Sequence, residues 1–305
     1  MSVILPSILP YLESDRTDVR LQGLKVICSE LTALLLESSD EDIISTINSI
    51  NNCLETPKTR ELALTLLVNI TAEKALILST NLDTLNSLFT SCSNLLNQSK
   101  HINLVLIIIS NLTVVESNVE PFLNFSKSSS ESNMFQTIVH NFISHNPQSE
   151  DELVDAAFVW DEIDKWQHGG SVLCNITRFE KGQQLILCKS SLYYPALCSQ
   201  IRSKNLVRRR SAIAAIRNCL FDTSEHWWIV VEANIITLLL FPIVTNAELS
   251  ENEKKGMDPV LWLQVVSSYL YNALPHLLPT SMHNNSSLLF RPKIQISVMI
   301  LIERY

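Results

Sequence analysis

A thiol close to an imidazole is the pairing in this sequence that would best suit nucleophilic catalysis. Cys219 precedes His226 by seven residues, so the two side chains could meet across a turn. An adjacent imidazole can remove the thiol proton and leave a nucleophilic thiolate. However, no nucleophile-elbow, kinase or zincin motif accompanies the pair, and nothing assembles a nucleophile, a base and an oxyanion donor. We therefore interpret Cys219 as a buried thiol and His226 as a helix-end histidine, and we predict that the chain is not an enzyme.

Residue types that bind metals and cofactors are present without the spacing that such sites need. The seven cysteines include no CxxC pair and do not cluster with histidine at ligand spacing, which predicts reduced and mostly buried thiols. The chain has only five glycines, and none of them belongs to a GxGxxG fingerprint or a Walker A loop. We therefore predict no metal and no cofactor.

Charge and hydropathy narrow the class of partner. The chain carries 23 lysines and arginines against 31 aspartates and glutamates, a net charge of −8 at pH 7. An acidic surface disfavours DNA, RNA and anionic lipid, so we expect neither a nucleic-acid partner nor a membrane. The longest apolar run, residues 104–109, is far shorter than the roughly 20 residues that span a bilayer, and no secretory signal is visible. These features predict a cytoplasmic protein.

A short pattern centred on asparagine recurs four times along the chain. The four residues are Asn69, Asn111, Asn175 and Asn218, and the first three begin an Asn-X-Thr triplet. The asparagines are separated by 42, 64 and 43 residues. Two of these intervals fall within the roughly 40–47 residues of armadillo and HEAT repeats. The longer interval fits one repeat plus an insertion, for which the serine-rich residues 126–132 and the acidic residues around 150–164 are available.

The residues around each asparagine follow helical spacing. Ile213, Ile216 and Leu220 recur at intervals of three and four residues and so form one apolar stripe. A single repeat cannot bury such a stripe, so neighbouring repeats must stack. The sequence predicts an all-α fold, a right-handed armadillo/HEAT-like α-solenoid of about six repeats over residues 1–261. Prolines are expected to separate its helices, because they lack an amide hydrogen: Pro57, Pro121, Pro147 and Pro195.

The segment from Val207 to Trp227 carries the most specific motif. It combines three arginines at 208–210, the run Ile-Arg-Asn-Cys-Leu-Phe-Asp-Thr at 216–223 and His-Trp at 226–227. This combination resembles the HGH-one family of armadillo-type proteins, also called brain-protein-16-like. Ser211 and Leu220 depart from the family pattern, which has glycine and a second cysteine there. The resemblance ends near residue 261, so we interpret residues 262–305 as a divergent, poorly ordered tail, with strand-like alternation near its end.

The family resemblance implies a chaperone adaptor. Such proteins are thought to help translation elongation factor two to fold, by bridging it to the chaperonin and to the ninety-kilodalton heat-shock chaperone through a tetratricopeptide co-chaperone. The resemblance thus implies a non-enzymatic protein-binding scaffold with elongation factor two as its client and chaperone machinery as its partner. Periodicity supports the coarser statement, an α-solenoid with an extended binding surface.

The four asparagines are candidate protein-binding residues. In peptide-binding armadillo proteins, an asparagine recurs on the third helix of each repeat, where its amide offers a donor and an acceptor to an extended ligand backbone. Asn69, Asn111, Asn175 and Asn218 either point into such a groove or cap neighbouring loops, and the sequence leaves both open. The alternative function is therefore a transport-type armadillo protein that binds extended peptides along an asparagine ladder, although the arginines around Asn218 argue against basic peptides.

Two runs of like charge provide further candidates. Residues 202–217 hold six basic residues and no acid, and residues 150–164 hold seven acids and no base. Either run is by default a solvated helix face, but stacked repeats can align a basic stripe toward an acidic partner. Tryptophans either pack between repeats or stack on a bound peptide, and we favour packing. The additional candidate binding residues are Arg208, Arg209, Arg210, Arg217 and Trp227.

Overall fold

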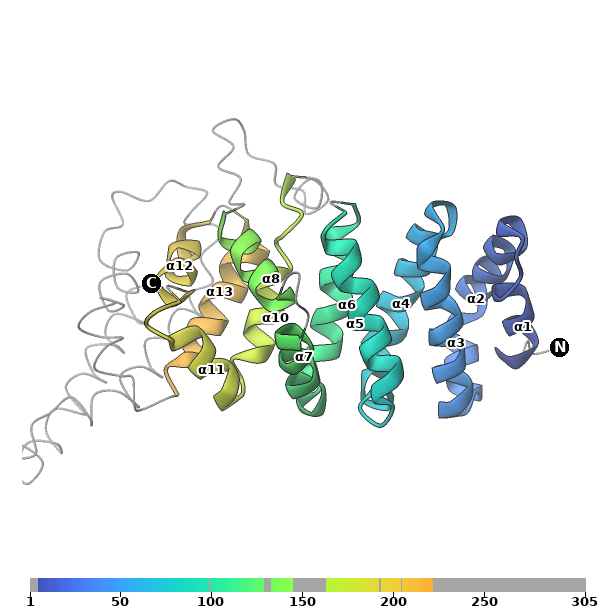
Figure 1. Ribbon diagram of the computed structural model, residues 1–305, viewed down its shortest axis with the longest axis horizontal. Helices are drawn as coiled ribbons and strands as arrows, with labels where there is room; N and C mark the ends of the chain where they lie inside the picture. The colour runs from blue at the N-terminus through green and yellow to red at the C-terminus, as the bar shows by residue number, and fades with distance from the viewer. Residues whose placement is uncertain are drawn as a thin grey trace, which may run out of the picture. The chain divides into compact units, whose positions relative to one another are not determined.

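The computed structural model describes residues 5–98, 100–128, 133–144, 163–191, 193–203 and 205–221 of the chain (Figure 1). These residues form helices and turns, and none of them lies in a strand. The predicted all-α class is therefore confirmed in this part of the chain. The chain divides into two compact units, Met1–His140 and Asn141–Tyr305.

The first unit is built from two rows of stacked helices. Helices α1, α3, α5 and α7 pack against one another in series, and α2, α4 and α6 form a second row (Figure 1). Because members of the two rows also pair, as α3 does with α4, the unit has the layered arrangement of an α-solenoid. The bounds are α1 (Leu5–Leu12), α2 (Thr17–Glu37), α3 (Asp40–Asn52), α4 (Pro57–Leu78), α5 (Leu82–Leu96), α6 (Ile102–Val114) and α7 (Glu116–Ser128), with a 3-10 turn at Cys53–Glu55 and α8 (Met134–Ser144) continuing into the second unit.

Helix α6 shows why the longest apolar run belongs in the core. Its residues Val105, Leu106, Ile108, Ile109 and Leu112 are fully buried. A helix that is apolar on most of its circumference must be covered on most sides, and α6 contacts α4, α5 and α7. The run is therefore a core helix, and no helix in the described ranges is both long and apolar enough to cross a membrane.

The second unit centres on the packing of α10 along α13. Its helices are α10 (Gly169–Ile176), α11 (Glu180–Leu187), α12 (Tyr193–Ser199) and α13 (Leu206–Cys219), with a 3-10 turn at Gln200–Arg202. Gly170 permits the close approach of α10 and α13. A Cβ atom at Gly170 would lie 2.8 Å from Cζ of Phe142 and 2.9 Å from Cβ of Ser211, too close for either neighbour to stay in place.

The prolines follow the predicted pattern at two positions and break it at a third. Pro57 is the first residue of α4, where its missing amide hydrogen costs nothing, and Pro195 lies in the first turn of α12. The prediction that Pro121 ends a helix is wrong, because Pro121 lies inside α7. The adjacent Phe122 and Leu123 are buried, and this tertiary packing stabilises a helix that has lost one backbone hydrogen bond.

Several predictions concern residues outside the described ranges. These are Pro147, most of the predicted insertion, His226, Trp227 and the tail at residues 262–305. The division into a solenoid of residues 1–261 and a divergent tail therefore stays a prediction.

Candidate functional site

Asn111 ties helix α6 to helix α4 in the first unit. Its Nδ2 atom donates to the backbone oxygen of Val68 at 3.0 Å and to Oγ1 of Thr71 at 3.2 Å. The Thr71 hydroxyl in turn donates to the backbone oxygen of Leu67 at 2.7 Å. Its proton is therefore directed into its own helix, while its oxygen accepts from the next asparagine helix.

Asn218 makes the same connection between helices α13 and α10 in the second unit. Its Nδ2 atom donates to the backbone oxygen of Cys174 at 3.0 Å and to Oγ1 of Thr177 at 3.3 Å. Thr177 donates to the backbone oxygen of Leu173 at 2.9 Å. In both units the acceptors stand one residue before and two residues after the neighbouring helix's own asparagine, so one polar link recurs with one register.

These links account for the repeated Asn-X-Thr triplet. The threonine is needed by the asparagine of the following repeat, a partnership that sequence reasoning missed although the recurring threonine was its signal. An amide nitrogen carries two hydrogens, and both are used by Asn111 and by Asn218. Asn175 is half-buried, whereas Asn69 is exposed and its side chain makes no hydrogen bond within the described residues. Of the two roles left open by the sequence, Asn111 and Asn218 thus have a structural role between repeats.

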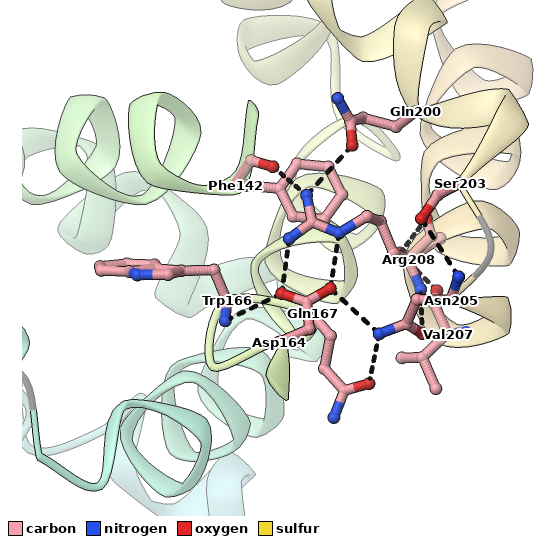
Figure 2. Close-up of polar contacts among 10 residues, drawn as sticks. Phe142, Asp164, Trp166, Gln167, Gln200, Ser203, Asn205, Val207 and Arg208 are labelled. Carbon is pink, nitrogen blue, oxygen red and sulfur yellow. Dashed lines mark hydrogen bonds and ion pairs between the residues drawn. The ribbon is translucent and has the colours of Figure 1, made fainter. Parts of the chain in front are cut away.

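Arg208 lies at the centre of a buried polar cluster in the second unit (Figure 2). Its side chain is fully buried and forms a bidentate ion pair with Asp164, through Nε at 2.7 Å and a terminal nitrogen at 2.6 Å. The other terminal nitrogen donates to the backbone oxygen of Phe142 and, at 3.1 Å, to Oε1 of Gln200. The guanidinium carbon lies 4.4 Å from the centroid of the Phe142 ring, a cation–π distance.

The Asp164 carboxylate is fully occupied by hydrogen-bond donors. Besides Arg208, it accepts from Nδ2 of Asn205 at 3.0 Å and from the backbone amide of Trp166 at 3.3 Å. Asn205 also caps α13, because its Oδ1 accepts from the amide of Val207 at 2.9 Å. No acceptor position is left for a substrate proton, so this cluster holds the second unit together and offers no general base. Trp166 is itself buried, as packing predicts.

The prediction that the basic run at residues 202–217 forms a solvated helix face is wrong for two of its arginines. Arg208 is buried, and Arg209 is 5% exposed with a terminal nitrogen donating to the backbone oxygen of Ser203 at 3.0 Å. Of the other two candidate arginines, Arg210 is exposed and Arg217 is half-buried. The acidic run at residues 150–164 and the basic run at 202–217 are joined internally through Asp164 and Arg208, and a guanidinium paired in this way is withdrawn from any partner surface.

An accessible strip recurs on the four asparagine helices. Counted from each asparagine, the positions at −7, −4, −1 and +3 are exposed or half-buried in every copy, and helical spacing places them on one face. We call this strip the asparagine face. In the first unit it is uncharged at these positions: Leu62, Thr65, Val68 and Ala72 on α4, and Leu104, Ile107, Ser110 and Val114 on α6. In the second unit it comprises His168, Ser171, Cys174 and Arg178 beside α10, and Ser211, Ala214, Arg217 and Phe221 beside α13.

Both arginines of the second asparagine face influence the pKa of one thiol, that of Cys174. Burial raises the pKa of Cys174, and the nearby positive charges of Arg217 and Arg178 partly offset that rise. Both guanidinium groups are therefore within electrostatic reach of the same side chain, although Arg178 lies in the turn after α10 and Arg217 on α13. Sequence inspection grouped Arg217 with the other basic residues of α13 and missed Arg178, which only the α10–α13 packing brings near.

The cysteines are free thiols, and most of them are buried as predicted. Cys53, Cys92, Cys198 and Cys219 are buried, and none of the seven forms a disulfide. Burial raises the pKa of Cys92 and of Cys198 to about 12. Within the described ranges, no group of three or more His, Cys, Asp and Glu side chains is placed to hold a metal ion.

Comparison with known proteins places this geometry in a family. A family model described as a domain of unknown function, DUF383, matches residues 51–267. A protein HGH1 homolog of Dictyostelium discoideum is 21% identical over 261 residues, which are 83% of this chain and 69% of that relative. The homolog of Xenopus tropicalis is 29% identical over 93 residues, which are 30% of this chain and 26% of that relative.

Solved structures with a similar fold are armadillo repeat proteins. A designed armadillo repeat protein in complex with the peptide (KR)4 superposes with a TM-score of 0.60 at 13% identity, covering 87% of this chain and 99% of that one. Another designed armadillo repeat protein gives a TM-score of 0.58 at 14% identity, with 87% and 99% coverage. At this identity the likeness concerns the fold, and the predicted α-solenoid is confirmed.

The residues matched by the family model include the motif around Asn218. The spans matched in the relatives differ, from about a quarter of the Xenopus tropicalis protein to about two thirds of the Dictyostelium one. Because the family model matches well over half of the 305 residues, the chain belongs to this family, and its resemblance to the HGH-one family is confirmed.

Proposed function

We propose that this chain is a non-enzymatic, cytoplasmic protein-binding scaffold that helps translation elongation factor two to fold together with chaperone machinery. The client and the chaperones come from the family resemblance. The observation that carries the binding role is the asparagine face, which is accessible at the same register in both units. A repeated accessible strip on stacked helices provides an extended surface for a partner.

A protein-binding role also accounts for how the reactive groups are used. The Asp164 carboxylate and the Arg208 guanidinium form a buried ion pair with each other, and burial keeps the thiols of Cys92 and Cys198 protonated. A catalytic site needs a nucleophile and a base within reach of substrate. These buried groups stabilise the solenoid, and its accessible face supplies contacts.

Purified elongation factor two provides the direct test. The full-length chain, immobilised at low density, should bind elongation factor two and should leave an unrelated GTP-binding protein of similar size in solution. In a refolding experiment with chaperonin present, the chain should increase the yield of active elongation factor two. Absence of binding together with an unchanged refolding yield would contradict the client assignment.

The rival function is a transport-type protein that binds extended peptides. Its support is the fold shared with a designed protein in complex with the peptide (KR)4, and the exposed Glu61 and Glu73 near the exposed Asn69. Against it stand the amide hydrogens of Asn111 and Asn218, which are already committed between repeats. Titration with the peptide (KR)4 separates the two: binding that is lost in the Asn69→Ala variant would favour the rival.

A further inference from the structure

Three corners of the first unit lie along one edge of its helix stack. Each joins a helix of the second row to the next helix of the first row: α2 to α3, α4 to α5 and α6 to α7 (Figure 1). Helices α1 and α3 end at the opposite edge, where the Cys53 thiol donates to the backbone oxygen of Leu12 at 3.7 Å, and α4 starts there. The α6–α7 corner lies against the end of α4, because Nδ2 of Asn118 donates to the backbone oxygens of Leu112 at 3.1 Å and Ala75 at 3.3 Å. We call these three corners the corner edge, which comprises residues 36–42, 76–83 and 114–116.

Large apolar side chains are exposed at each of these corners. Leu36 is 80% exposed, and Leu76 and Leu82 are 67% and 52% exposed. Val114, which also belongs to the asparagine face, is 50% exposed. Among the first-unit residues whose burial is described, Tyr11 is the one other large apolar side chain that is exposed. Single exposed leucines are ordinary on a protein surface, but their recurrence at three stacked corners indicates an interaction surface.

The corner edge is also acidic. It contains no lysine, arginine or histidine and six acids, which are Glu37, Asp40, Glu41, Asp42, Asp83 and Glu116. The last five stand in the first turns of α3, α5 and α7, where the helix dipole favours them. Glu37 is the last residue of α2, where the dipole disfavours an acid, so the dipole does not account for its position. The exposed Glu37, Asp83 and Glu116 make no ion pair within the described residues, and the nearest base along the chain, Lys74, is half-buried.

The corners at the opposite edge of the same unit mix both signs of charge. Arg16 follows Asp15 between α1 and α2, and Lys58 follows Glu55 by three residues between α3 and α4. Negative charge and repeated apolar exposure therefore coincide at the corner edge, and this combination complements a surface that is both apolar and basic.

The spacing of the corners suits a partner helix. Packed helices lie about 8–10 Å apart, so apolar side chains at successive corners recur at roughly that distance. An α-helix rises about 1.5 Å per residue, so seven of its residues cover about 10.5 Å. A helix with one apolar side chain per heptad thus presents apolar contacts at nearly the same interval as the three corners.

We infer that the corner edge of the first unit binds a basic amphipathic helix of a partner protein. The apolar stripe of that helix covers Leu36, Leu76 and Val114, and lysines or arginines beside the stripe face the carboxylates. The inference rests on the proposed scaffold function, since a scaffold that joins two proteins needs a second surface besides the asparagine face. An anionic membrane fits less well, because the acids of the corner edge repel its headgroups.

The probe is a fluorescein-labelled peptide of about three heptads, and its binding to the full-length chain is measured by fluorescence anisotropy. Leucine occupies one position in each heptad, lysine stands on either side of it on the helix surface, and alanine and glutamine fill the remaining positions. We expect saturable binding that weakens as salt is added, because salt screens the attraction between accessible carboxylates and lysines. A peptide of the same composition whose leucines are scattered around the helix should bind at least about fivefold more weakly.

Charge reversal tests the acidic part of the corner edge. Glu37→Lys/Asp83→Lys should bind the peptide at least about tenfold more weakly than the unaltered chain. The matched control is Asp15→Lys/Glu55→Lys, which makes the same change in net charge at exposed corner residues of the opposite edge. That control should bind within about twofold of the unaltered chain, because the added charges lie far from the peptide and are screened.

Loss of apolar contact is tested separately. Leu36→Ser/Leu76→Ser should bind the peptide at least about fivefold more weakly, whereas Tyr11→Ser, at an exposed apolar residue outside the corner edge, should bind within about twofold of the unaltered chain. Because all the substituted side chains are exposed, circular dichroism should show that every variant is folded.

Several outcomes would overturn the inference. These are absence of peptide binding, equal loss of affinity in the two charge-reversal variants, and equally tight binding of the peptide with scattered leucines. Sedimentation equilibrium of the chain alone provides a further check. If the unaltered chain is a dimer and Leu36→Ser/Leu76→Ser is a monomer, a second copy occupies the corner edge and the inference is wrong.

Failure of this inference can be distinguished from failure of the proposed function. If elongation factor two binds the chain and the basic peptide does not, the scaffold function stands and the assigned role of the corner edge is wrong. If the peptide binds the corner edge but elongation factor two does not bind at all, the edge is correct and the proposed client is wrong.

Discussion

The two asparagine faces share a framework and differ in charge. In the first unit Asn111 links α6 to α4, and in the second Asn218 links α13 to α10, with matching donors and acceptors. The accessible positions around these links are uncharged in the first unit, whereas Arg178 and Arg217 occupy two of them in the second. These links between helices thus fix how the helices stack, while the accessible positions can differ between the units and so determine what each face can bind.

The second unit also contains a buried ion pair. Of the substitutions considered, breaking this pair should cause the largest loss of stability. Asp164→Asn removes the carboxylate and leaves the fully buried Arg208 without its counter-charge, which should destabilise the second unit by about 3–5 kcal/mol. Hydrogen exchange followed by mass spectrometry, read helix by helix, should show faster exchange in α13 than in the unaltered chain.

The exposed Arg16–Asp18 pair of the first unit is the matched control for Asp164→Asn. The hydrogen bond from Arg16, with a smaller contribution from its charge, lowers the pKa of Asp18, but both side chains are solvent-exposed and their pair is screened by water. Asp18→Asn should therefore leave exchange in both units unchanged. Equal effects of the two substitutions would contradict a special role for the buried pair.

The close approach of α10 and α13 predicts the next largest effect. Gly170→Ala places a methyl group against Phe142 and Ser211, which should cost about 1–3 kcal/mol by overpacking. Thermal unfolding followed by circular dichroism measures this loss. Because Ser211 supplies part of the collision, Gly170→Ala/Ser211→Gly should recover part of the stability, and a double variant no better than the single one would show that Ser211 is not the obstacle.

The asparagine links predict a smaller loss that is similar in both units. Asn111→Ala and Asn218→Ala each remove two hydrogen bonds between helices and should cost about 1–2 kcal/mol in their own unit. Asn69→Ala serves as the control, because this exposed side chain makes no such link and its loss should stay within about 0.5 kcal/mol. Chemical denaturation gives the free energy of unfolding of each of the three variants. If Asn69→Ala loses as much stability as Asn111→Ala, the hydrogen bonds of Asn111 between helices do not explain the loss.

Alkaline pH should lower the free energy of unfolding of both units in the same way. Burial raises the pKa of Cys92 in the first unit and of Cys198 in the second to about 12, whereas a thiol in an unfolded chain titrates near 8.5. Below the unfolded pKa, both states keep the proton and stability is unaffected. As the pH rises from that value toward 12, the unfolded state alone ionises, so each buried thiol lowers the free energy of unfolding.

Replacing either cysteine isolates this effect. When the pH is raised from 7 to 9.5, the free energy of unfolding should fall in the unaltered chain and in Cys92→Ala. The fall should be roughly 1 kcal/mol smaller in Cys92→Ala, because the variant lacks one buried thiol. Cys198→Ala should behave in the same way. Urea denaturation at the two pH values provides the measurement, and identical pH dependence in the variants and the unaltered chain would show that these thiols ionise equally in both states.

The sequence was sufficient to predict the repeat and insufficient to predict the burial of its charges. The recurring asparagines and the apolar stripe of α13 established an α-solenoid, because helical spacing is a local property. The pairing of Arg208 with Asp164 depends on residues 44 positions apart meeting in three dimensions, and a run of three arginines gives no sign of which one faces inward. Pro121 was misjudged for a related reason, since burial of Phe122 outweighed a local preference.

Chemical modification of arginine tests whether the asparagine face of the second unit binds the proposed client. Phenylglyoxal reacts with accessible guanidinium groups, so in the free full-length chain it should label Arg178, Arg210 and Arg16 and spare the buried Arg208 and Arg209. With elongation factor two bound, Arg178, which belongs to the asparagine face, should become protected, while Arg16, in the first unit, should stay reactive. Continued labelling of Arg178 in the complex would contradict the proposal that the asparagine face of the second unit binds the client.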